Sequence, residues 1–237
     1  MRLLCLGDSY TIGEAVAARD TWPMQLAQLL EQALTEQFRV HIIAKTGWST
    51  DELSAAIDCA ETAHEIHPPY ELVSLAIGVN NQYRDRSVEN YAVEFSALLK
   101  RAISFAAAKA SRVLVLSIPD WGQTPFASQD ARGPEKIAAQ IDFFNAESRR
   151  QAAAAGAHFI EVTPLSRIKD PELVADDGLH PSAIAYAQWA HAVFDQAILA
   201  LSDKENARLS VISGSNPKTP PPRLNDPKPT PVRSSCV

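Results

Sequence analysis

Two kinds of segment alternate regularly over residues 1–201, and this alternation limits the possible folds more than any other property of the sequence. Short apolar runs are followed by longer runs in which apolar residues recur at helical spacing. We expect strands at about residues 3–6, 40–44, 72–77, 113–118 and 157–162, and helices at about 22–37, 50–66, 88–108, 135–155 and 182–201. The apolar runs do not alternate with polar residues, which is typical of strands covered on both faces. The sequence therefore predicts an α/β fold, a three-layer α/β/α sandwich around a central five-stranded parallel sheet.

One helix start is expected to be simple. Either Ser49 or Thr50 can cap the helix that begins near residue 50. Three residues after Thr50 the chain has Leu53 rather than Glu, so we expect a plain cap without a capping box.

The composition changes near residue 202. Seven prolines lie between residues 217 and 231, mixed with Lys, Arg, Ser and Asn. Such a segment holds too few apolar side chains to offset the entropy that ordering it would cost. We therefore predict one globular domain at residues 1–201 and a disordered, Pro-rich tail at residues 202–237. A docking segment is the alternative for the tail.

Charge and hydropathy restrict the partners. The formal net charge of −6 argues against nucleic acid or an anionic membrane as the main partner. No run of about 18 apolar residues is present, so we expect no transmembrane helix and no stable membrane insertion. The first apolar run is too short for the core of a signal peptide, which predicts a cytoplasmic location. These properties leave the oligomeric state open.

Cysteine and histidine spacing does not indicate a bound metal. Cys5, Cys59 and Cys236 are widely spaced and odd in number, so we expect neither a disulfide framework nor a zinc site. Cys5 lies in an apolar strand and is expected to be inert packing. His64 and His67 flank a glutamate at a helix end, and we interpret them as a solvated helix terminus rather than as metal ligands.

A polar cluster follows the first apolar run. That run stops at Gly7, Asp8 and Ser9 come next, and residues 14–18 form a small, helix-compatible run. We expect a strand, a turn at Gly7, whose backbone tolerates angles that other residues avoid, and the first turn of a helix. Ser9 would then lie at a helix N-terminus, where free N–H donors and partial positive charge favour an anion. The alternative is that Asp8 or Ser9 merely caps the helix.

A histidine and an aspartate on a late loop could activate this serine. Ligand crevices of parallel sheets lie beyond the carboxyl ends of the strands, so loops that follow different strands should meet there. A serine hydroxyl needs a base to take its proton, and His180 is the candidate. Asp177, three residues earlier, can bind the far ring nitrogen and stabilise the imidazolium. The imidazole must be neutral to accept the proton, so activity should fall at acid pH. An ordinary surface loop is the alternative for both residues.

Attack on an ester carbonyl creates an oxyanion, which needs donors already aimed at it. Three donors are available at strand ends: the backbone N–H of Ser9, the backbone N–H of Gly47 and the side-chain amide of Asn80. We expect Gly47 to permit close backbone approach and Asn80 to lie in a turn begun by a glycine. Taken singly, each of them also fits ordinary turn chemistry.

The long loop at residues 119–126 is the candidate for the wall of a substrate pocket. We assign substrate binding to Tyr10, Trp48, Asn81, Trp121 and Phe126, with Gln82 and Tyr83 facing the same loop. Aromatic walls suit acyl chains and sugar rings alike, so they do not select a substrate. The alternative is that Trp121 and Phe126 simply anchor the loop.

Four blocks together resemble the GDSL/SGNH hydrolase family. They are Gly7-Asp8-Ser9-Tyr10, Gly47, Gly78-Val79-Asn80-Asn81 and Asp177-Gly178-Leu179-His180-Pro181, in the order that the family has them. The first block alone is a weak signal, but the full set, with Asp-x-x-His-Pro near the domain end, is strong. The resemblance spans about residues 2–200. It implies a flavodoxin-like fold, no cofactor, and hydrolysis of carboxylic esters through an acyl-enzyme.

The same resemblance implies a role for each matching residue. Ser9 is carried over as nucleophile, His180 as base and Asp177 as the residue that orients it, while Gly47 and Asn80 are carried over as oxyanion donors together with the Ser9 N–H. The chain departs from the family at residue 81, where Asn stands in place of a frequent Asp. That position lies outside the catalytic set, so the departure bears on loop geometry and substrate preference.

The function expected from these residues is that of a serine esterase. Its substrate would be a small-molecule ester of short-acyl, acetyl or lysophospholipid type. Acyl transfer and carbohydrate deacetylation are alternatives on the same site. A nucleotide-binding module is an alternative from another class, but the chain has neither the dinucleotide-binding Gly-x-Gly-x-x-Gly after its first strand nor a P-loop.

Overall fold

The structure, a computed structural model, describes residues 1–212, with side chains described to residue 202. Residues 1–203 form one compact unit. The disorder predicted for the tail falls mainly on residues 213–237, which lie outside the described residues, and it stays a prediction.

A five-stranded parallel sheet runs through this unit in the order β2-β1-β3-β4-β5. Its strands are β1 (Arg2–Gly7), β2 (Arg39–Ala44), β3 (Leu72–Ala76), β4 (Val113–Leu116) and β5 (His158–Ile160). This order is that of flavodoxin-like folds, with the switch point between β1 and β3. The predicted α/β class and strand number are confirmed.

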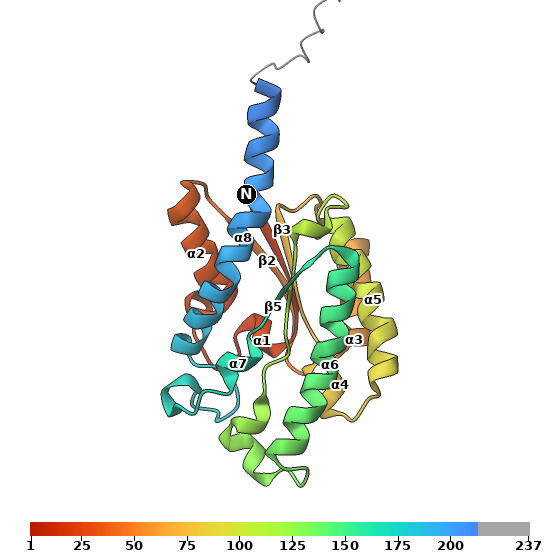
Figure 1. Ribbon diagram of the computed structural model, residues 1–237, viewed down its shortest axis with the longest axis vertical. Coiled ribbons are helices and arrows are strands. Elements are labelled where there is room, and N and C mark those ends of the chain that lie inside the picture. Colours follow the sequence, from red (N-terminus) through yellow and green to blue (C-terminus); the bar gives the residue numbers. More distant parts are fainter. Residues whose placement is uncertain (213–237) are drawn as a thin grey trace, which may run out of the picture. The chain divides into compact units, whose positions relative to one another are not determined.

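Helices cover both faces of the sheet. The α-helices are α1 (Ser9–Ile12), α2 (Trp22–Leu34), α3 (Thr50–Thr62), α4 (Val79–Tyr83), α5 (Val88–Phe105), α6 (Pro134–Ala155), α7 (Thr163–Ser166) and α8 (Ala183–Ile212). Single turns of 3₁₀ type are η1 (Ala18–Asp20), η2 (Ala110–Arg112), η3 (Trp121–Gln123), η4 (Pro125–Gln129) and η5 (Pro171–Leu173). Figure 1 shows α2 and α8 on one face and α3, α5 and α6 on the other. Among the described helices, none has the length and apolar content needed to cross a membrane.

The strand register brings the candidate loops together. Gly7 at the end of β1 is paired with Ala44 at the end of β2 and with Ala76 at the end of β3. The three strands therefore end level, and the segments that carry Ser9, Gly47 and Asn80 leave the sheet at the same edge. Buried apolar side chains fill the space between the sheet and both helix layers, with Leu3, Leu4 and Leu6 fully buried in β1, an inner strand of the sheet.

Several expected helix features were wrong. The helix ends expected near residues 37, 66 and 108 lie at Leu34, Thr62 and Phe105. The run at residues 14–18 is not an α-helix, because Gly13 takes a left-handed conformation and ends α1 after one turn. Ser49, rather than Thr50, is the N-cap of α3, and it forms a capping box with Glu52, so the plain cap expected from Leu53 is incorrect. Helix α8 continues to Ile212, past residue 201, since residues 202–212 contain neither Gly nor Pro. The one-turn helices α4 and α7 were too short for a periodic signal.

Candidate active site

Asp8 and Ser9 take different positions at the end of β1. Asp8 is the N-cap of α1: its Oδ1 accepts the backbone N–H of Tyr10 at 3.1 Å, and its carbonyl accepts those of Thr11 and Ile12. The cap interpretation therefore applies to Asp8. Ser9 is the first residue of the helix, so its hydroxyl is not used for capping.

Gly7 is required for space rather than for its backbone angles. A Cβ at this position would lie 2.1 Å from Thr11 Oγ1 and 2.6 Å from the carbonyl oxygen of Ala76. Gly7 is part of the extended strand β1 and is not among the described residues with positive φ. The expectation that Gly7 supplies unusual turn angles was wrong, and the close approach of α1 and β3 is the physical reason for the glycine.

Ser9, His180 and Asp177 form a continuous hydrogen-bonded chain. His180 Nε2 lies 2.9 Å from Ser9 Oγ, and His180 Nδ1 lies 2.5 Å from Asp177 Oδ2. The other carboxylate oxygen of Asp177 accepts the backbone N–H groups of Leu179 and His180, both at 2.9 Å. Ser9 is 5% exposed and His180 is 6% exposed, so both are largely shielded from water, whereas the side chain of Asp177 is 33% exposed. The geometry is that of a nucleophile, a base and a group that orients the base.

The pKa values of two carboxyl groups near Ser9 are shifted in opposite directions. Partial burial alone would raise the pKa of Asp177, but the hydrogen bonds from the His180 ring and from the backbone of His180 and Leu179 outweigh it and hold this pKa below its ordinary value. Complete burial raises the pKa of Asp8 to about 7, although the Tyr10 N–H opposes the shift. Asp177 is therefore an anion near neutral pH, as a partner of an imidazolium must be, whereas Asp8 is close to its midpoint.

Asn80 lies in α4 and is oriented by the loop that carries Gly47. Its Nδ2 donates to the carbonyl oxygen of Trp48 at 2.9 Å. A primary amide has a second N–H, which remains for a ligand. Gly47 has φ of 85°, which favours glycine, and a Cβ there would meet only the Arg84 guanidinium at 3.8 Å. Positive φ, rather than crowding, therefore explains this glycine.

The backbone N–H groups of Ser9 and Gly47 have no acceptor within the part of the chain that the structure describes. For Ser9 this follows from its place in the first turn of a helix, where N–H groups lack an intrahelical partner. These two N–H groups and the Asn80 amide thus lie at the same edge of the sheet. Ser9 and Asn80 line the small cavity described next, while Gly47 does not line it.

A cavity of about 120 Å³ opens beside the Ser9 hydroxyl. The residues that line it are Ser9, Tyr10, Val79, Asn80, Tyr83, Trp121, Phe126, Leu179 and His180. Predicted pocket residues Tyr10, Trp121 and Phe126 therefore face the serine, and Phe126 is 45% exposed at the rim. We refer to this space as the small cavity.

Two predicted substrate-binding residues lie away from it. Asn81 is fully buried, accepts the backbone N–H of Thr50 at 3.1 Å and donates to Thr50 Oγ1 at 2.6 Å. It joins α4 to the start of α3, so its assignment to substrate binding was wrong. Trp48 does not line the small cavity either: its ring packs against the core, and only its carbonyl meets the site, through Asn80.

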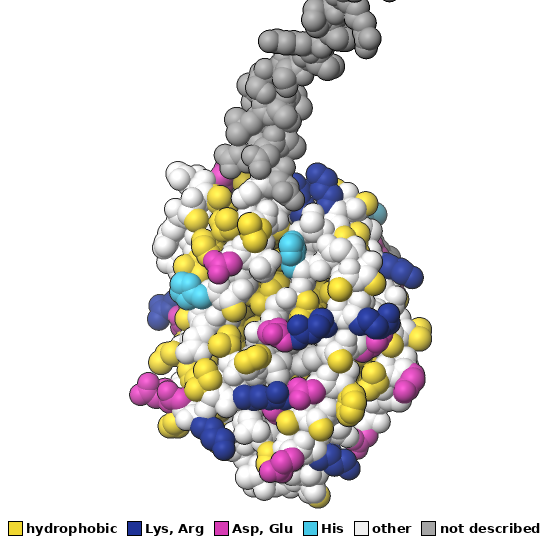
Figure 2. Space-filling model, viewed as in Figure 1, with side chains coloured by type: hydrophobic (Ala, Val, Ile, Leu, Met, Phe, Trp, Pro, Cys, Tyr) yellow, Lys and Arg dark blue, Asp and Glu magenta, His cyan; other side chains and the backbone are white. Residues whose placement is uncertain are grey.

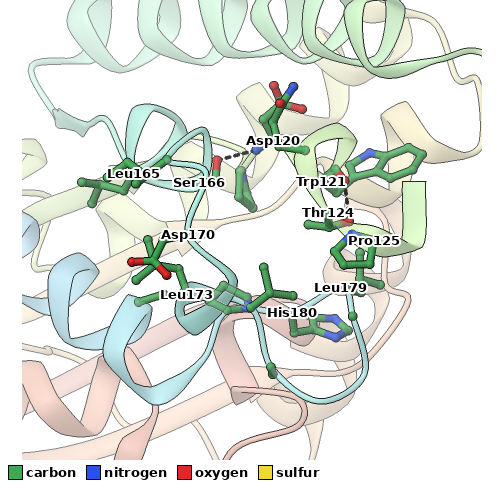
Figure 3. Close-up of a pocket in the computed structure, with 18 of the residues that line it drawn as sticks. Asp120, Trp121, Thr124, Pro125, Leu165, Ser166, Asp170, Leu173, Leu179 and His180 are labelled. Carbon is green, nitrogen blue, oxygen red and sulfur yellow. Dashed lines mark hydrogen bonds between the residues drawn. The ribbon is translucent and has the colours of Figure 1, made fainter. Parts of the chain in front are cut away.

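A second cavity, of about 780 Å³, lies between the segment that follows β4 and the loop that precedes α8. Figure 3 shows His180 and Leu179 on one side of it and Asp120 and Ser166 on the other. It shares Tyr10, Trp121, Leu179 and His180 with the small cavity. We refer to it as the large cavity.

A backbone hydrogen bond joins the segment after β4 to the loop that carries Asp177 and His180. The N–H of Phe126 donates to the carbonyl oxygen of Gly178 at 2.9 Å. Pro125 approaches the same glycine, because a Cβ on Gly178 would lie 3.5 Å from the Cβ of Pro125. This contact fixes the aromatic rim of the small cavity relative to His180.

Two arginines that hold this site were missed by sequence reasoning. Arg84 Nη2 donates to the carbonyl oxygen of Gly47 at 2.6 Å, and its Nη1 donates to Glu52 at 2.9 Å. Arg132 contacts the C-terminal end of α4 and Trp121. The carbonyl groups that these arginines bind, those of Gly47 and Tyr83, lie 37 and 49 positions away in the sequence, so no local pattern could have identified these contacts.

Other residues considered from the sequence take no part in this arrangement. Among the described residues, no group of three or more His, Cys, Asp or Glu side chains could hold a metal ion. Cys5 is fully buried, and burial raises the pKa of its thiol to about 12, which agrees with inert packing. On the face drawn in Figure 2, Lys and Arg side chains lie among Asp and Glu, so charges of both signs are mixed over it.

The chain is similar to a known protein family and to several solved structures. The model of the GDSL-like Lipase/Acylhydrolase family matches residues 5–188. A crystal structure of TesA has a TM-score of 0.63 at 19% identity and covers 85% of this chain and 100% of its own.

Two further solved structures are similar in fold. The lipase Lip_vut3 from a goat rumen metagenome has a TM-score of 0.68 at 17% identity and covers 83% of this chain and 97% of its own. Axe2, an acetylxylan esterase from Geobacillus stearothermophilus, has a TM-score of 0.63 at 17% identity and covers 83% of this chain and 93% of its own. No curated protein sequence matches the chain.

Proposed function

Because the chain belongs to the GDSL-like Lipase/Acylhydrolase family and is a carboxylic ester hydrolase, we propose that it cleaves short-acyl esters through an acyl-enzyme on Ser9. The observation that carries the proposal is the hydrogen-bonded chain from Ser9 Oγ through both ring nitrogens of His180 to Asp177. The Ser9–His180 bond is the path of the proton, and the His180–Asp177 bond orients the ring and stabilises the imidazolium.

In the first half-reaction, Ser9 Oγ attacks the ester carbonyl while His180 Nε2 takes the hydroxyl proton. Asp177 holds the opposite ring nitrogen and stabilises the imidazolium. The imidazolium then gives its proton to the departing alcohol oxygen as the carbon–oxygen bond breaks, which leaves an acyl-serine. In the second half-reaction, water takes the place of the serine hydroxyl, and the acid is released with Ser9 regenerated.

The oxyanion of each tetrahedral intermediate needs donors that are in place before the reaction. We assign this role to the backbone N–H groups of Ser9 and Gly47 and to the free N–H of the Asn80 amide. The Trp48 carbonyl supports the assignment for Asn80, because it fixes the plane of that amide.

The small cavity supports a short acyl group. Its volume of about 120 Å³ is below the roughly 150 Å³ of a protein cavity that accepts benzene. Its walls are aromatic and aliphatic apart from Ser9, Asn80 and His180, so it favours an apolar chain. An acyl chain of about four carbons or fewer is the proposed occupant.

Deacetylation of a carbohydrate is the second candidate, and the large cavity favours it. This cavity reaches His180, which would protonate the leaving alcohol, and polar side chains such as Ser166, Lys169 and Asp170 line it. A polyhydroxylated leaving group would find hydrogen-bond partners there. The fold is similar to that of Axe2, whose description names acetylxylan as its substrate.

An ester panel tests both candidates. We expect p-nitrophenyl acetate and butyrate to have higher kcat/KM than the octanoate, and the Ser9→Ala variant to lose nearly all turnover while it keeps the unfolding temperature of the parent. Acetylated xylo-oligosaccharide as the better substrate would favour the second candidate. Turnover that persists in Ser9→Ala would contradict the acyl-enzyme. Added alcohol that diverts product from acid to a new ester would indicate acyl transfer instead of hydrolysis.

The nucleotide-binding module that the sequence left as an alternative from another class is set aside, because the chain is a carboxylic ester hydrolase.

A further inference from the structure

Arg132, in the loop before α6, lies against two aromatic side chains of the small cavity. Its guanidinium carbon lies 5.2 Å from the centre of the Trp121 ring and 5.6 Å from that of Tyr83. The Arg132 side chain is only 14% exposed. A partly desolvated guanidinium over two aromatic faces attracts both rings and restrains where they lie.

The guanidinium also ties the loop to α4. Its Nε and Nη2 donate to the two carboxylate oxygens of Asp130 at 2.9 and 2.8 Å, which fixes the plane of the group. Its Nη1 donates to the carbonyl oxygens of Gln82 and Tyr83 at 3.4 and 3.3 Å, and to Asp85 at 3.4 Å. One side chain therefore meets the end of α4 and an aromatic residue of the segment after β4.

These are the two segments that build the wall of the small cavity. Helix α4 supplies Asn80 and Tyr83, and the segment after β4 supplies Trp121 and Phe126. Trp121 also donates from its indole N–H to Gln82 Oε1 at 2.8 Å, and its ring contacts Tyr83 edge-on with centres 5.3 Å apart. Arg132 does not line the cavity itself.

The simple interpretation of Arg132 is a surface ion pair with Asp130. Exposed ion pairs contribute little to folding stability. The low exposure of Arg132 and its partner Asp130, together with the two ring contacts, sets it apart from such a pair. Arg150 is the contrasting case: it is 67% exposed, and the structure gives it only Glu147 as a partner among the described residues.

We propose that Arg132 is a positioning residue that sets acyl-chain selectivity, because it holds Tyr83 and Trp121 in place as the wall of the small cavity. The proposal rests on the proposed esterase function of the same site. When the guanidinium is removed, Tyr83, which is 44% exposed, is free to move outward from Trp121, and the space beside Ser9 lengthens. The kcat/KM for esters of longer acyl chains then rises relative to that for acetate.

The test measures kcat/KM for p-nitrophenyl acetate and for p-nitrophenyl hexanoate. It is carried out on the parent enzyme, on Arg132→Met and Arg132→Lys, and on the control variant Arg150→Gln. Methionine keeps apolar contact with the rings but lacks the donors. We expect Arg132→Met to raise the hexanoate-to-acetate ratio of kcat/KM by about tenfold, which is the effect of one or two methylenes in an apolar pocket. Arg132→Lys should give an intermediate ratio, since an ammonium cannot form the planar fork. Arg150→Gln should leave the ratio unchanged.

The outcomes separate this proposal from the function on which it rests. One outcome is that the parent enzyme turns over both esters while Arg132→Met leaves the hexanoate-to-acetate ratio of kcat/KM as it was, whether or not both values fall by the same factor. In that case Arg132 has only a structural role and the proposal is wrong. If Arg132→Met does not fold, the Lys variant decides in the same way. A parent enzyme that hydrolyses none of the esters overturns the proposed function and this assignment together.

Discussion

The two sides of Ser9 are held in place by different kinds of contact. On the histidine side, Asp177 binds the His180 ring and the backbone N–H groups of Leu179 and His180, all within four positions of the chain. On the acyl side, Trp121 binds Gln82 across 39 positions and Arg132 binds the carbonyl of Tyr83 across 49. The contacts of Asp177 lie within a single loop, whereas those on the acyl side join segments that are far apart in the chain.

This difference predicts how the two sides respond to substitution. Changes on the histidine side should affect the rate of the chemical step with every ester, because each substrate uses the same proton transfers. Changes on the acyl side should alter the choice between esters more than the rate with the best one.

The largest effect is expected at Asp177. Asp177→Asn leaves a side chain of similar shape, but its amide would favour the wrong tautomer of His180, and we expect kcat to fall by about 10⁴ with all esters. Steady-state kinetics at neutral pH measure the fall, with Glu172→Gln as an exposed acid on the same loop for control. A loss below about tenfold would show that this carboxylate does not orient the base.

A smaller effect is expected at Asn80, which lies in α4 on the acyl side but is assigned to the oxyanion of every substrate. Its amide is held by the Trp48 carbonyl and also lines the small cavity. We expect Asn80→Ala to lower kcat by about 10²–10³ with little change in KM, as for the loss of one oxyanion donor. Asn90→Ala, on the exposed surface of α5, serves as the control. A rise in KM at constant kcat would make Asn80 a binding residue and not an oxyanion donor.

The last effect is expected at Asp8 and concerns stability rather than turnover. Burial raises the pKa of this carboxyl from 3.8 to about 7, so the folded state holds the proton over a range in which the unfolded chain has released it. The contribution of Asp8 to the stability of the parent should therefore be complete below about pH 4 and be lost as pH rises towards about 7. Asp8→Asn keeps an N-cap acceptor and does not titrate.

Urea unfolding at several pH values checks this expectation. Asp8→Asn should be more stable than the parent at about pH 8, by up to about 4 kcal/mol, and this advantage should vanish near pH 4. A difference between the two proteins that does not vary with pH would mean that Asp8 titrates normally. Asp8 would then be an ordinary cap in spite of its burial.

The same contrast explains what could be predicted from the sequence. The parallel sheet, its strands and the convergence of Ser9 with His180 and Asp177 follow from apolar runs and from short polar blocks at strand ends, which are local signals. Asn81 was misassigned because its neighbour Asn80 faces the cavity, while a helical turn directs Asn81 to Thr50 instead. The capping box was missed through a shift of one residue in the N-cap.

Arg84 and Arg132 had no signal in the sequence at all. Each is one of many charged residues in polar segments, and its importance depends on rings and carbonyls that lie far away in the chain. Tertiary contacts of this kind can be found only once the fold is known. The acyl side of the site is therefore the part that sequence reasoning describes least well.

Covalent labelling of the serine tests the central claim most directly. The protein is treated with an alkyl fluorophosphonate, and intact-mass measurement followed by peptide mapping locates the adduct. We expect one adduct per chain, on Ser9, with loss of esterase activity in the same proportion, and no adduct on the folded Ser9→Ala variant. An adduct on another residue, or full activity in a protein labelled at Ser9, would contradict the assignment of Ser9 as the nucleophile.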